Sequence, residues 1–225
     1  MVKLGLLHTV KSGYLLYEPQ IKARIPNISI YTILDDFLSK ESGEKGYATT
    51  LCRNKVLTDC RMMEECGVDV VLCACSSMSP VIPDTRKYLK IPLISVDELM
   101  IQTVVEREQD ILVFATAYSA GNAVSKAIQE KASEQLKSIH IDVLVCNAAG
   151  EIVRKGGSMA EHDRLALACF DQNFVNKKTV VFAQSSNAHL GRPIAEKYHV
   201  RTYTNLEYCI TDLEQTIARL ENAQR

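Results

Sequence analysis

The sequence predicts an α/β protein made of two similar lobes, each built on a doubly wound parallel sheet. Three observations lead to this prediction: short apolar runs alternate with helical stretches, capping residues mark helix starts, and one half of the chain echoes the other. With 225 residues, of which 47% are hydrophobic and 24% charged, the chain can bury a substantial core without disulfides or a metal.

The strands are predicted from short runs of Val, Ile and Leu that do not alternate with polar residues. Such runs are typical of parallel strands buried on both faces, and the helical stretches between them indicate βαβ units. The predicted strands cover residues 4–7, 28–34, 68–75, 93–96, 111–115, 141–146 and 179–183.

The helix starts are predicted from a serine or threonine followed three residues later by glutamate. Such a pair can satisfy the N–H groups left unbonded in the first turn of a helix. Gly67 is predicted to end a helix of residues 54–66, which places Val68 at the start of the next strand. The predicted pairs are Ser95 with Glu98, Ser158 with Glu161, and Thr204 with Glu207.

An internal repeat relates the two halves of the chain. Residues 70–77, VVLCACSS, line up with residues 180–187, VVFAQSSN, and residues 3–9, KLGLLHT, line up with residues 110–116, DILVFAT. Both offsets are close to half the chain length, so we expect two lobes related by a pseudo-two-fold axis. The first lobe is expected to hold residues 1–97 and 205–225, and the second residues 98–204. The alternative is that buried strands rich in Val and Leu resemble one another by composition alone.

The charge balance and the lack of long apolar runs exclude several classes of protein. The 26 basic and 27 acidic residues leave a net charge of −1, without a basic footprint for nucleic acid or a membrane surface. No uncharged apolar run reaches the ~18 residues of a membrane span. Residues 1–10 are too short and too weakly basic for a signal peptide, so we expect a cytoplasmic protein.

The eight cysteines are expected to be free thiols. Cys73, Cys146 and Cys169 lie inside apolar runs, and a reducing compartment keeps such thiols unpaired. Cys73 and Cys75 are separated by one residue, which matches neither a CxxC redox pair nor a zinc knuckle. The sequence therefore predicts no metal site.

The sharpest local feature is the segment CSSMSP at residues 75–80, directly after a predicted strand. Ligands of open parallel sheets bind beyond the carboxyl ends of the strands, and small residues there let backbone N–H groups point toward a carboxylate. The same field is expected to lower the pKa of the Cys75 thiol from ~8.5 toward neutrality, which makes thiolate available. The alternative is a buried packing cysteine, which we expect for Cys73.

These segments resemble a known family. Cys-Ser-Ser at residues 75–77 is similar to the Cys-Asn/Ser-Thr/Ser motif of the aspartate/glutamate/hydantoin racemase superfamily. Leu-Asp-Asp at residues 34–36 and the stretch 157–163, which ends in His162-Asp163, resemble further motifs of that group in the same order. The resemblance implies two flavodoxin-like lobes with the substrate closed between them. It also implies proton transfer at a carbon next to a carboxylate, without pyridoxal phosphate or metal.

The physical requirements of this chemistry can be stated independently. Removal of the proton needs a base of tunable pKa and fixed donors that hold the enediolate-like charge. Racemisation further needs an acid on the opposite face of the carbon, which one thiol per lobe would supply. The second-lobe position is occupied here by Gln184 or Ser185, depending on how the repeat is aligned, and neither ionises near neutral pH.

Three functions remain open after this departure. In the first, another group serves the second face, and the candidates are His189, His8 and Cys146. In the second, Cys75 acts alone in a decarboxylase, isomerase or lyase, while the serines of the second lobe only bind. In the third, the chain binds a small carboxylate and catalyses nothing.

Other polar residues near strand ends are expected either to support the site or to cap helices. Thr9 and Thr116 occupy equivalent places, and Thr116 resembles the substrate-binding threonine of the family. Tyr118, Ser119 and Asn122 could orient a polar substrate, Asp35 and Asp36 could cap a helix, and His162-Asp163 fits the first turn of a helix.

The sequence as a whole predicts a cofactor-independent isomerase acting on an amino acid, a hydantoin or a related small carboxylate. Cys75 is the expected thiolate base, and His189 is the first candidate for a second acid. A one-cysteine lyase or decarboxylase is the alternative, and the chain could form a homo-oligomer. The expected substrate-binding residues are Thr9, Ser76, Ser77, Thr116, Gln184, Ser185 and Ser186.

Overall fold

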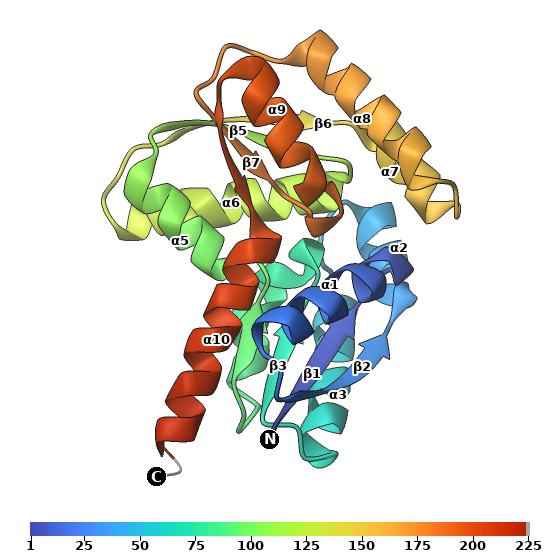
Figure 1. The fold of residues 1–225 in the computed structure, drawn as a ribbon, viewed down its shortest axis with the longest axis vertical. Helices are drawn as coiled ribbons and strands as arrows, with labels where there is room; N and C mark the ends of the chain where they lie inside the picture. Colours follow the sequence, from blue (N-terminus) through green and yellow to red (C-terminus); the bar gives the residue numbers. More distant parts are fainter. Residues whose placement is uncertain (224–225) are drawn as a thin grey trace. The chain divides into compact units, whose positions relative to one another are not determined.

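A computed structural model describes residues 1–223, which divide into two compact units (Figure 1). The first unit holds Met1–Leu99 together with the residues from Leu206 onward, and the second holds Met100–Asn205. Each unit has its own sheet and its own hydrophobic core.

Both sheets are parallel and have the same strand order. The order is β2-β1-β3-β4 in the first unit and β6-β5-β7-β8 in the second. The internal repeat therefore extends to the topology, and the predicted α/β class with two parallel sheets is confirmed. The strands are β1 (Val2–His8), β2 (Ile28–Leu34), β3 (Val70–Cys73), β4 (Leu93–Ser95), β5 (Asp110–Ala115), β6 (His140–Val145), β7 (Thr179–Phe182) and β8 (Arg201–Thr204).

Helices connect consecutive strands, as parallel pairing requires. Two short 3₁₀ helices directly follow the central strands β3 and β7 and occupy matching places in the two units. The 3₁₀ helices are η1 (Ser76–Val81) and η2 (Ser185–Leu190), and the α-helices are α1 (Lys11–Arg24), α2 (Asp36–Lys45), α3 (Thr50–Glu65), α4 (Ile82–Arg86), α5 (Glu98–Arg107), α6 (Tyr118–Glu134), α7 (Asn147–Arg154), α8 (Met159–Asn173), α9 (Gly191–Tyr198) and α10 (Asn205–Ala223).

The predicted helix starts are confirmed in part. The Ser158 hydroxyl accepts a hydrogen bond from the Glu161 amide at 3.2 Å and caps α8. The prediction for Ser95 is wrong, because β4 extends through Ser95 and its hydroxyl donates to the Ser79 hydroxyl at 3.0 Å instead. Gly67 follows α3 with a φ of 77°, a left-handed conformation that glycine adopts without strain.

Strand β8 is not among the predicted strands. Its sequence, RTYT, contains a single apolar residue, Tyr203, whose side chain is buried. The strand lies at the edge of its sheet, where only β7 pairs with it. A short edge strand of this kind lacks the continuous apolar run on which the prediction depended.

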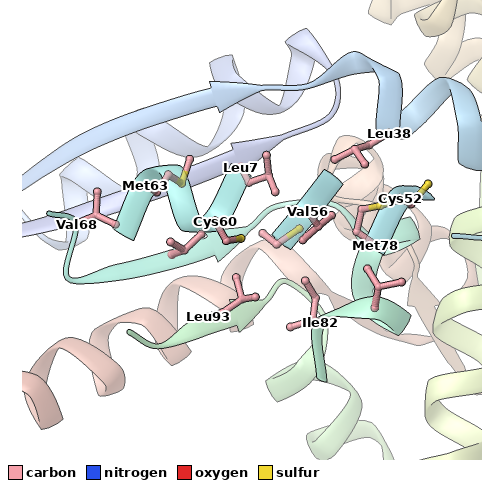
Figure 2. Packing of buried hydrophobic residues seen from close by; sticks show 13 residues of the cluster. Leu7, Leu38, Cys52, Val56, Cys60, Met63, Val68, Met78, Ile82 and Leu93 are labelled. Carbon is pink, nitrogen blue, oxygen red and sulfur yellow. The ribbon is translucent and has the colours of Figure 1, made fainter. Parts of the chain in front are cut away.

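The core of the first unit is built on one face of α3. Cys52, Val56, Cys60 and Met63 recur at helical spacing and are buried against β1, β3 and β4. Figure 2 shows these side chains gathered with those of the strands and of η1. The packing fixes the carboxyl ends of β1 and β3 next to each other.

Among residues 1–223, no helix combines the length and apolar character that a bilayer crossing needs.

The core of the second unit is aromatic. Phe114 of β5 contacts Phe170 of α8 and Phe182 of β7 edge-to-face, with ring centroids 5.3 and 5.5 Å apart. Helices α7 and α8 lie side by side against this core (Figure 1). The core thereby fixes the strand ends that carry the polar residues of this unit.

Candidate functional site

Cys75 and Thr9 meet at the carboxyl ends of the central strands of the first unit. Thr9 follows β1, and Cys75 follows β3 and directly precedes η1. The Thr9 hydroxyl donates a hydrogen bond to the Cys75 sulfur at 3.0 Å. The amide N–H groups of Ser77 and Met78 also lie close enough to this sulfur to lower its pKa, and the Met78 N–H donates to the Cys75 carbonyl oxygen at 2.9 Å. The strand end therefore presents one thiol surrounded by three donors.

The protonation of Cys75 differs from the prediction. The residue is partly exposed, but the protein around its sulfur removes enough water for burial to be the dominant effect. Burial raises the pKa of the Cys75 thiol, whereas the donors of Thr9, Ser77 and Met78 lower it and Asp97 raises it further. The net direction is upward, so the predicted fall toward neutrality is wrong and the resting sulfur is a thiol.

A serine network holds the η1 turn in place. The Ser76 hydroxyl donates to Asp97 Oδ1 at 2.9 Å, and the Ser79 hydroxyl donates to Asp97 Oδ2 at 2.7 Å. Ser76 and Ser77 are both buried. Because its one proton is directed at Asp97, Ser76 supports the turn in this arrangement rather than offering a donor to a ligand.

Thr116 and Gln184 meet at the corresponding strand ends of the second unit. Gln184 Oε1 accepts hydrogen bonds from the Thr116 amide at 2.7 Å and from the Thr116 hydroxyl at 3.2 Å. The buried Asn187 amide group donates to the same hydroxyl at 3.4 Å. These bonds fix the orientation of the Gln184 side chain, so its NH₂ group is directed away from Thr116.

The backbone resolves the alignment of the repeat in favour of Gln184. Leu7 pairs with Cys73 in one sheet as Phe114 pairs with Phe182 in the other. Cys75 and Gln184 each stand two residues after the central strand and directly before the 3₁₀ helix, with φ of −144° and −142°. The amide, not Ser185, therefore occupies the place of the thiol.

The two serines of the second turn have different surroundings. The Ser185 hydroxyl donates to Asn205 Oδ1 at 2.7 Å, just as Ser76 donates to Asp97. Ser186, the counterpart of Ser77, is half-buried. The substrate-binding roles of both serines stay predictions.

His189 is held by a carboxylate in the second unit. Its Nε2 lies 2.8 Å from Asp163 Oδ2, and the other oxygen, Oδ1, lies 2.8 Å from Nδ1 of the buried His162. His189 itself is exposed at the end of η2. An aspartate that accepts from one nitrogen leaves the other nitrogen of His189 able to exchange a proton.

His8 is enclosed against α1. Its side chain is 1% exposed and its ring contacts the rings of Tyr14 and Tyr17 on α1. Neither ring nitrogen has a hydrogen-bond partner. Burial lowers the pKa of His8 to about 4, against a smaller opposing effect of Glu18. A neutral, enclosed imidazole of this kind fits packing better than proton exchange with a ligand.

Cys146 is bonded to Cys169, which corrects the prediction of free thiols for both residues. The disulfide joins the residue before α7 to the middle of α8. No sequence pattern shows α7 and α8 to be neighbours, so the pairing of the two cysteines is a property of the tertiary packing. Cys146 has no thiol while this bond is present, so it cannot serve as the second acid.

The remaining predicted residues lie at helix starts. Asp35 caps α2 by accepting a hydrogen bond from the Phe37 amide at 3.1 Å, which confirms its capping role. Tyr118, Ser119 and Asn122 lie in the first turns of α6, after Thr116. Within residues 1–223, no group of three His, Cys, Asp or Glu side chains is arranged to hold a metal ion.

Comparison with known proteins identifies the family. A family model described as Asp/Glu/Hydantoin racemase matches residues 19–202, which is most of the sequence.

The chain belongs to the Asp/Glu/Hydantoin racemase family.

Solved racemase structures share the fold of this family member. Glutamate racemase from Francisella tularensis, in complex with D-glutamate, has a TM-score of 0.76 and 15% identity, covering 98% of this chain and 82% of that chain. Glutamate racemase from Thermus thermophilus has a TM-score of 0.73 and 15% identity, with coverages of 99% and 81%. Allantoin racemase from Klebsiella pneumoniae has a TM-score of 0.63 and 14% identity, with coverages of 97% and 88%. At such identities the likeness concerns the fold alone, and no curated protein matches the sequence.

Sequence reasoning missed several residues that shape the sites of this racemase-family chain. Asp97 and Asn205 bond to the serines of the two turns, and Asn187 bonds to Thr116. Asp97 and Asn205 each follow the fourth strand of a unit. By strand register Ser95 corresponds to Thr204, so Asn205 lies one residue earlier than the counterpart of Asp97, and the repeat alone does not pair the two.

Proposed function

We propose that the chain is a cofactor-independent enzyme that transfers a proton at the carbon next to a carboxylate, with Cys75 as its acid–base group. The expected substrates are amino acids, hydantoins or related small acids. The observation that carries the proposal is the hydrogen bond from the Thr9 hydroxyl to the Cys75 sulfur, with the amides of Ser77 and Met78 close to the same sulfur. Fixed donors at a strand end are what a developing enediolate requires.

The leading form of this function is an isomerase. Cys75 exchanges a proton with the carbon, and the amides of the η1 turn hold the negative charge that develops on the carboxylate. A second acid–base group is then required, and His189 is the candidate that keeps support. Its Nε2 is oriented by Asp163 at 2.8 Å, and its ring is exposed. Orientation of an imidazole by a carboxylate is a common device of general acid–base catalysis.

A one-cysteine decarboxylase or lyase is the second candidate, and two observations favour it. Gln184 occupies the place equivalent to Cys75 and cannot exchange a proton near neutral pH. Cys75 is a thiol at rest, because burial raises its pKa. In a decarboxylation the bond to the carboxylate breaks, its electron pair stays on carbon, and the thiol proton joins that carbon. Water then returns a proton to the sulfur.

The test is an incubation in deuterated water with a panel of amino acids, hydantoins and malonates, followed by NMR. Deuterium incorporation with inversion supports the isomerase, and a deuterated decarboxylated product supports the decarboxylase. Both activities are expected to disappear in Cys75→Ala and to persist in Cys66→Ser, which removes an exposed thiol elsewhere. Full turnover by Cys75→Ala, or ligand binding without any turnover across the panel, would contradict the proposal.

A further inference from the structure

A buried carboxylate lies beside the turn that follows Cys75. Asp97, between β4 and α5, is fully buried. Its two oxygens accept from the hydroxyls of Ser76 and Ser79 at 2.9 and 2.7 Å, so both are bonded to the η1 turn. These hydroxyls stabilise the carboxylate without bringing a positive charge to it. The carboxylate of Asp97 therefore contacts Ser76, the residue that directly follows Cys75.

The second unit contains a related arrangement without the charge, in which Ala188 stands at the place of Ser79. Ser185, the counterpart of Ser76, donates to Asn205 at 2.7 Å, and Asn205 is as fully buried as Asp97. A neutral amide thus supports this kind of turn, so folding alone does not require a carboxylate. The charged partner occurs in the unit that has the thiol, and the neutral partner occurs where Gln184 replaces it.

We propose that Asp97 is a positioning residue that keeps Cys75 in its neutral thiol form until an anionic substrate binds. The proposal rests on the proposed role of Cys75 as the acid–base group. Asp97 acts through space and through the η1 turn, and it is not expected to touch the reacting atoms. In agreement, Asp97 raises the pKa of Cys75, as burial does, and burial has the larger effect.

A neutral sulfur has a direct advantage for binding an anion. A thiol is a weak hydrogen-bond acceptor, whereas a thiolate binds N–H groups strongly. A resting thiolate would compete with a substrate carboxylate for the Ser77 amide, and it would repel the charge of that carboxylate. With the sulfur neutral, the carboxylate can take the Ser77 amide, and Cys75 holds a proton that it can give to the carbon once a bond to that carbon has broken and left its electron pair there.

The groups around the sulfur make Asp97 testable. Among the groups that shift the pKa of Cys75 or of the adjacent Cys73, the other titratable ones are Asp97 and Cys60 of α3. Burial raises the pKa of Cys73 well above its ordinary value and that of Cys60 to about 12, so both remain neutral in ordinary buffers. Asp97 is therefore the charged group among these three neighbours, and its replacement by a neutral residue removes that charge.

The experiment is the pH dependence of Cys75 alkylation by iodoacetamide, followed by peptide mass spectrometry on the full chain. A Cys66→Ser background removes the exposed thiol of the same tryptic peptide. Asp97→Asn is expected to lower the alkylation midpoint by about one pH unit. Alkylation at pH 7 should then be roughly threefold faster, because a larger thiolate fraction is partly offset by a weaker nucleophile. Asp84→Asn, which removes an exposed carboxylate, should leave the midpoint unchanged.

A second variant covers failure of Asp97→Asn to fold. Ser79→Ala removes one hydroxyl from the carboxylate, and the less compensated charge should raise the midpoint. If Asp97→Asn folds, an unchanged or higher alkylation midpoint overturns the proposal. If it does not fold, an unchanged or lower midpoint in Ser79→Ala overturns it. Alkylation needs no substrate, so this result is independent of the NMR panel, on which the proposed function itself depends.

Discussion

Thr9 is the residue that most directly holds the sulfur of Cys75. Its hydroxyl donates to that sulfur at 3.0 Å, and this bond lowers the pKa of the thiol. Thr9→Val keeps the shape of the side chain and removes the donor. The pKa of Cys75 is therefore expected to rise further, and alkylation at a fixed pH should slow several-fold. Thr58→Val, on the exposed side of α3, is the control and should leave the alkylation profile unchanged.

His8 predicts a dependence of stability on pH. The folded chain holds His8 neutral with a pKa lowered to about 4, whereas the unfolded side chain titrates near 6.5. Between these values the unfolded state binds more protons, so stability is fully present above pH 6.5 and is lost as the pH falls toward 4. The loss amounts to about 3 kcal/mol.

The measurement for His8 is urea unfolding between pH 4 and 7. His8→Leu should flatten the part of the pH dependence that His8 causes, since leucine does not titrate. His199→Asn, which replaces an exposed histidine, should keep the slope of the parent chain. Equal slopes for His8→Leu and the parent would show that the buried imidazole is not the cause.

At the scale of elements, α7 depends on a glycine that lets it approach a strand end. A Cβ at Gly150 would lie 1.9 Å from the Thr116 carbonyl oxygen, which is backbone and cannot move aside cheaply. Gly150→Ala should therefore destabilise the chain by roughly 1–3 kcal/mol and shift the Thr116 segment that orients Gln184. Gly43 in α2 has no atom within 4 Å of an added Cβ, so Gly43→Ala should stabilise by up to about 1 kcal/mol. Thermal unfolding of both variants checks the difference in sign.

The disulfide between α7 and α8 makes the second unit sensitive to reductant. Cys146 and Cys169 are 23 residues apart in sequence, and closing a loop of that length contributes about 3 kcal/mol. Reductant is therefore expected to speed hydrogen exchange in peptides of α7 and α8 but not in peptides of β1 and β3. Cys146→Ala should reproduce the effect without reductant, and Cys66→Ser should not. If reductant leaves the hydrogen-exchange rates of α7 and α8 unchanged, the two cysteines are free thiols.

At the scale of the molecule, most strands could be predicted because they depend on local pattern. Buried parallel strands are apolar runs, and the residues that follow neighbouring strands meet at one edge of the sheet, so the placement of Thr9 beside Cys75 and of Thr116 beside Gln184 follows from their positions, while their roles stay predictions. Strand β8 was missed because RTYT has no apolar run.

Other features of the sites depend on tertiary packing and could not be predicted. The direction of the Cys75 pKa shift is a balance between lost water and gained N–H groups, and only coordinates decide it. The Cys146–Cys169 bond and the partners Asp97 and Asn205 join residues that no sequence pattern relates. These features depend on packing, whereas the local pattern determines where the thiol lies.

The repeat allows the effect of a buried carboxylate on the pKa of a thiol to be tested a second time, in the second unit. Gln184→Cys places a thiol at the strand end where the Thr116 hydroxyl can donate to it, as Thr9 donates to Cys75. The neighbouring serine there bonds to neutral Asn205 instead of to a carboxylate. If the buried charge matters, the new thiol should have an alkylation midpoint lower than that of Cys75 by about one pH unit.

Adding the charge should reverse that difference. Gln184→Cys combined with Asn205→Asp restores the pairing of serine with carboxylate and is expected to raise the midpoint of the new thiol toward that of Cys75. Gln184→Ser has a hydroxyl at the same place and gives the background signal without a thiol. The same midpoint in the single and the double variant would show that the thiol is tuned by its burial and donors alone, so that the carboxylate at position 97 only supports its turn.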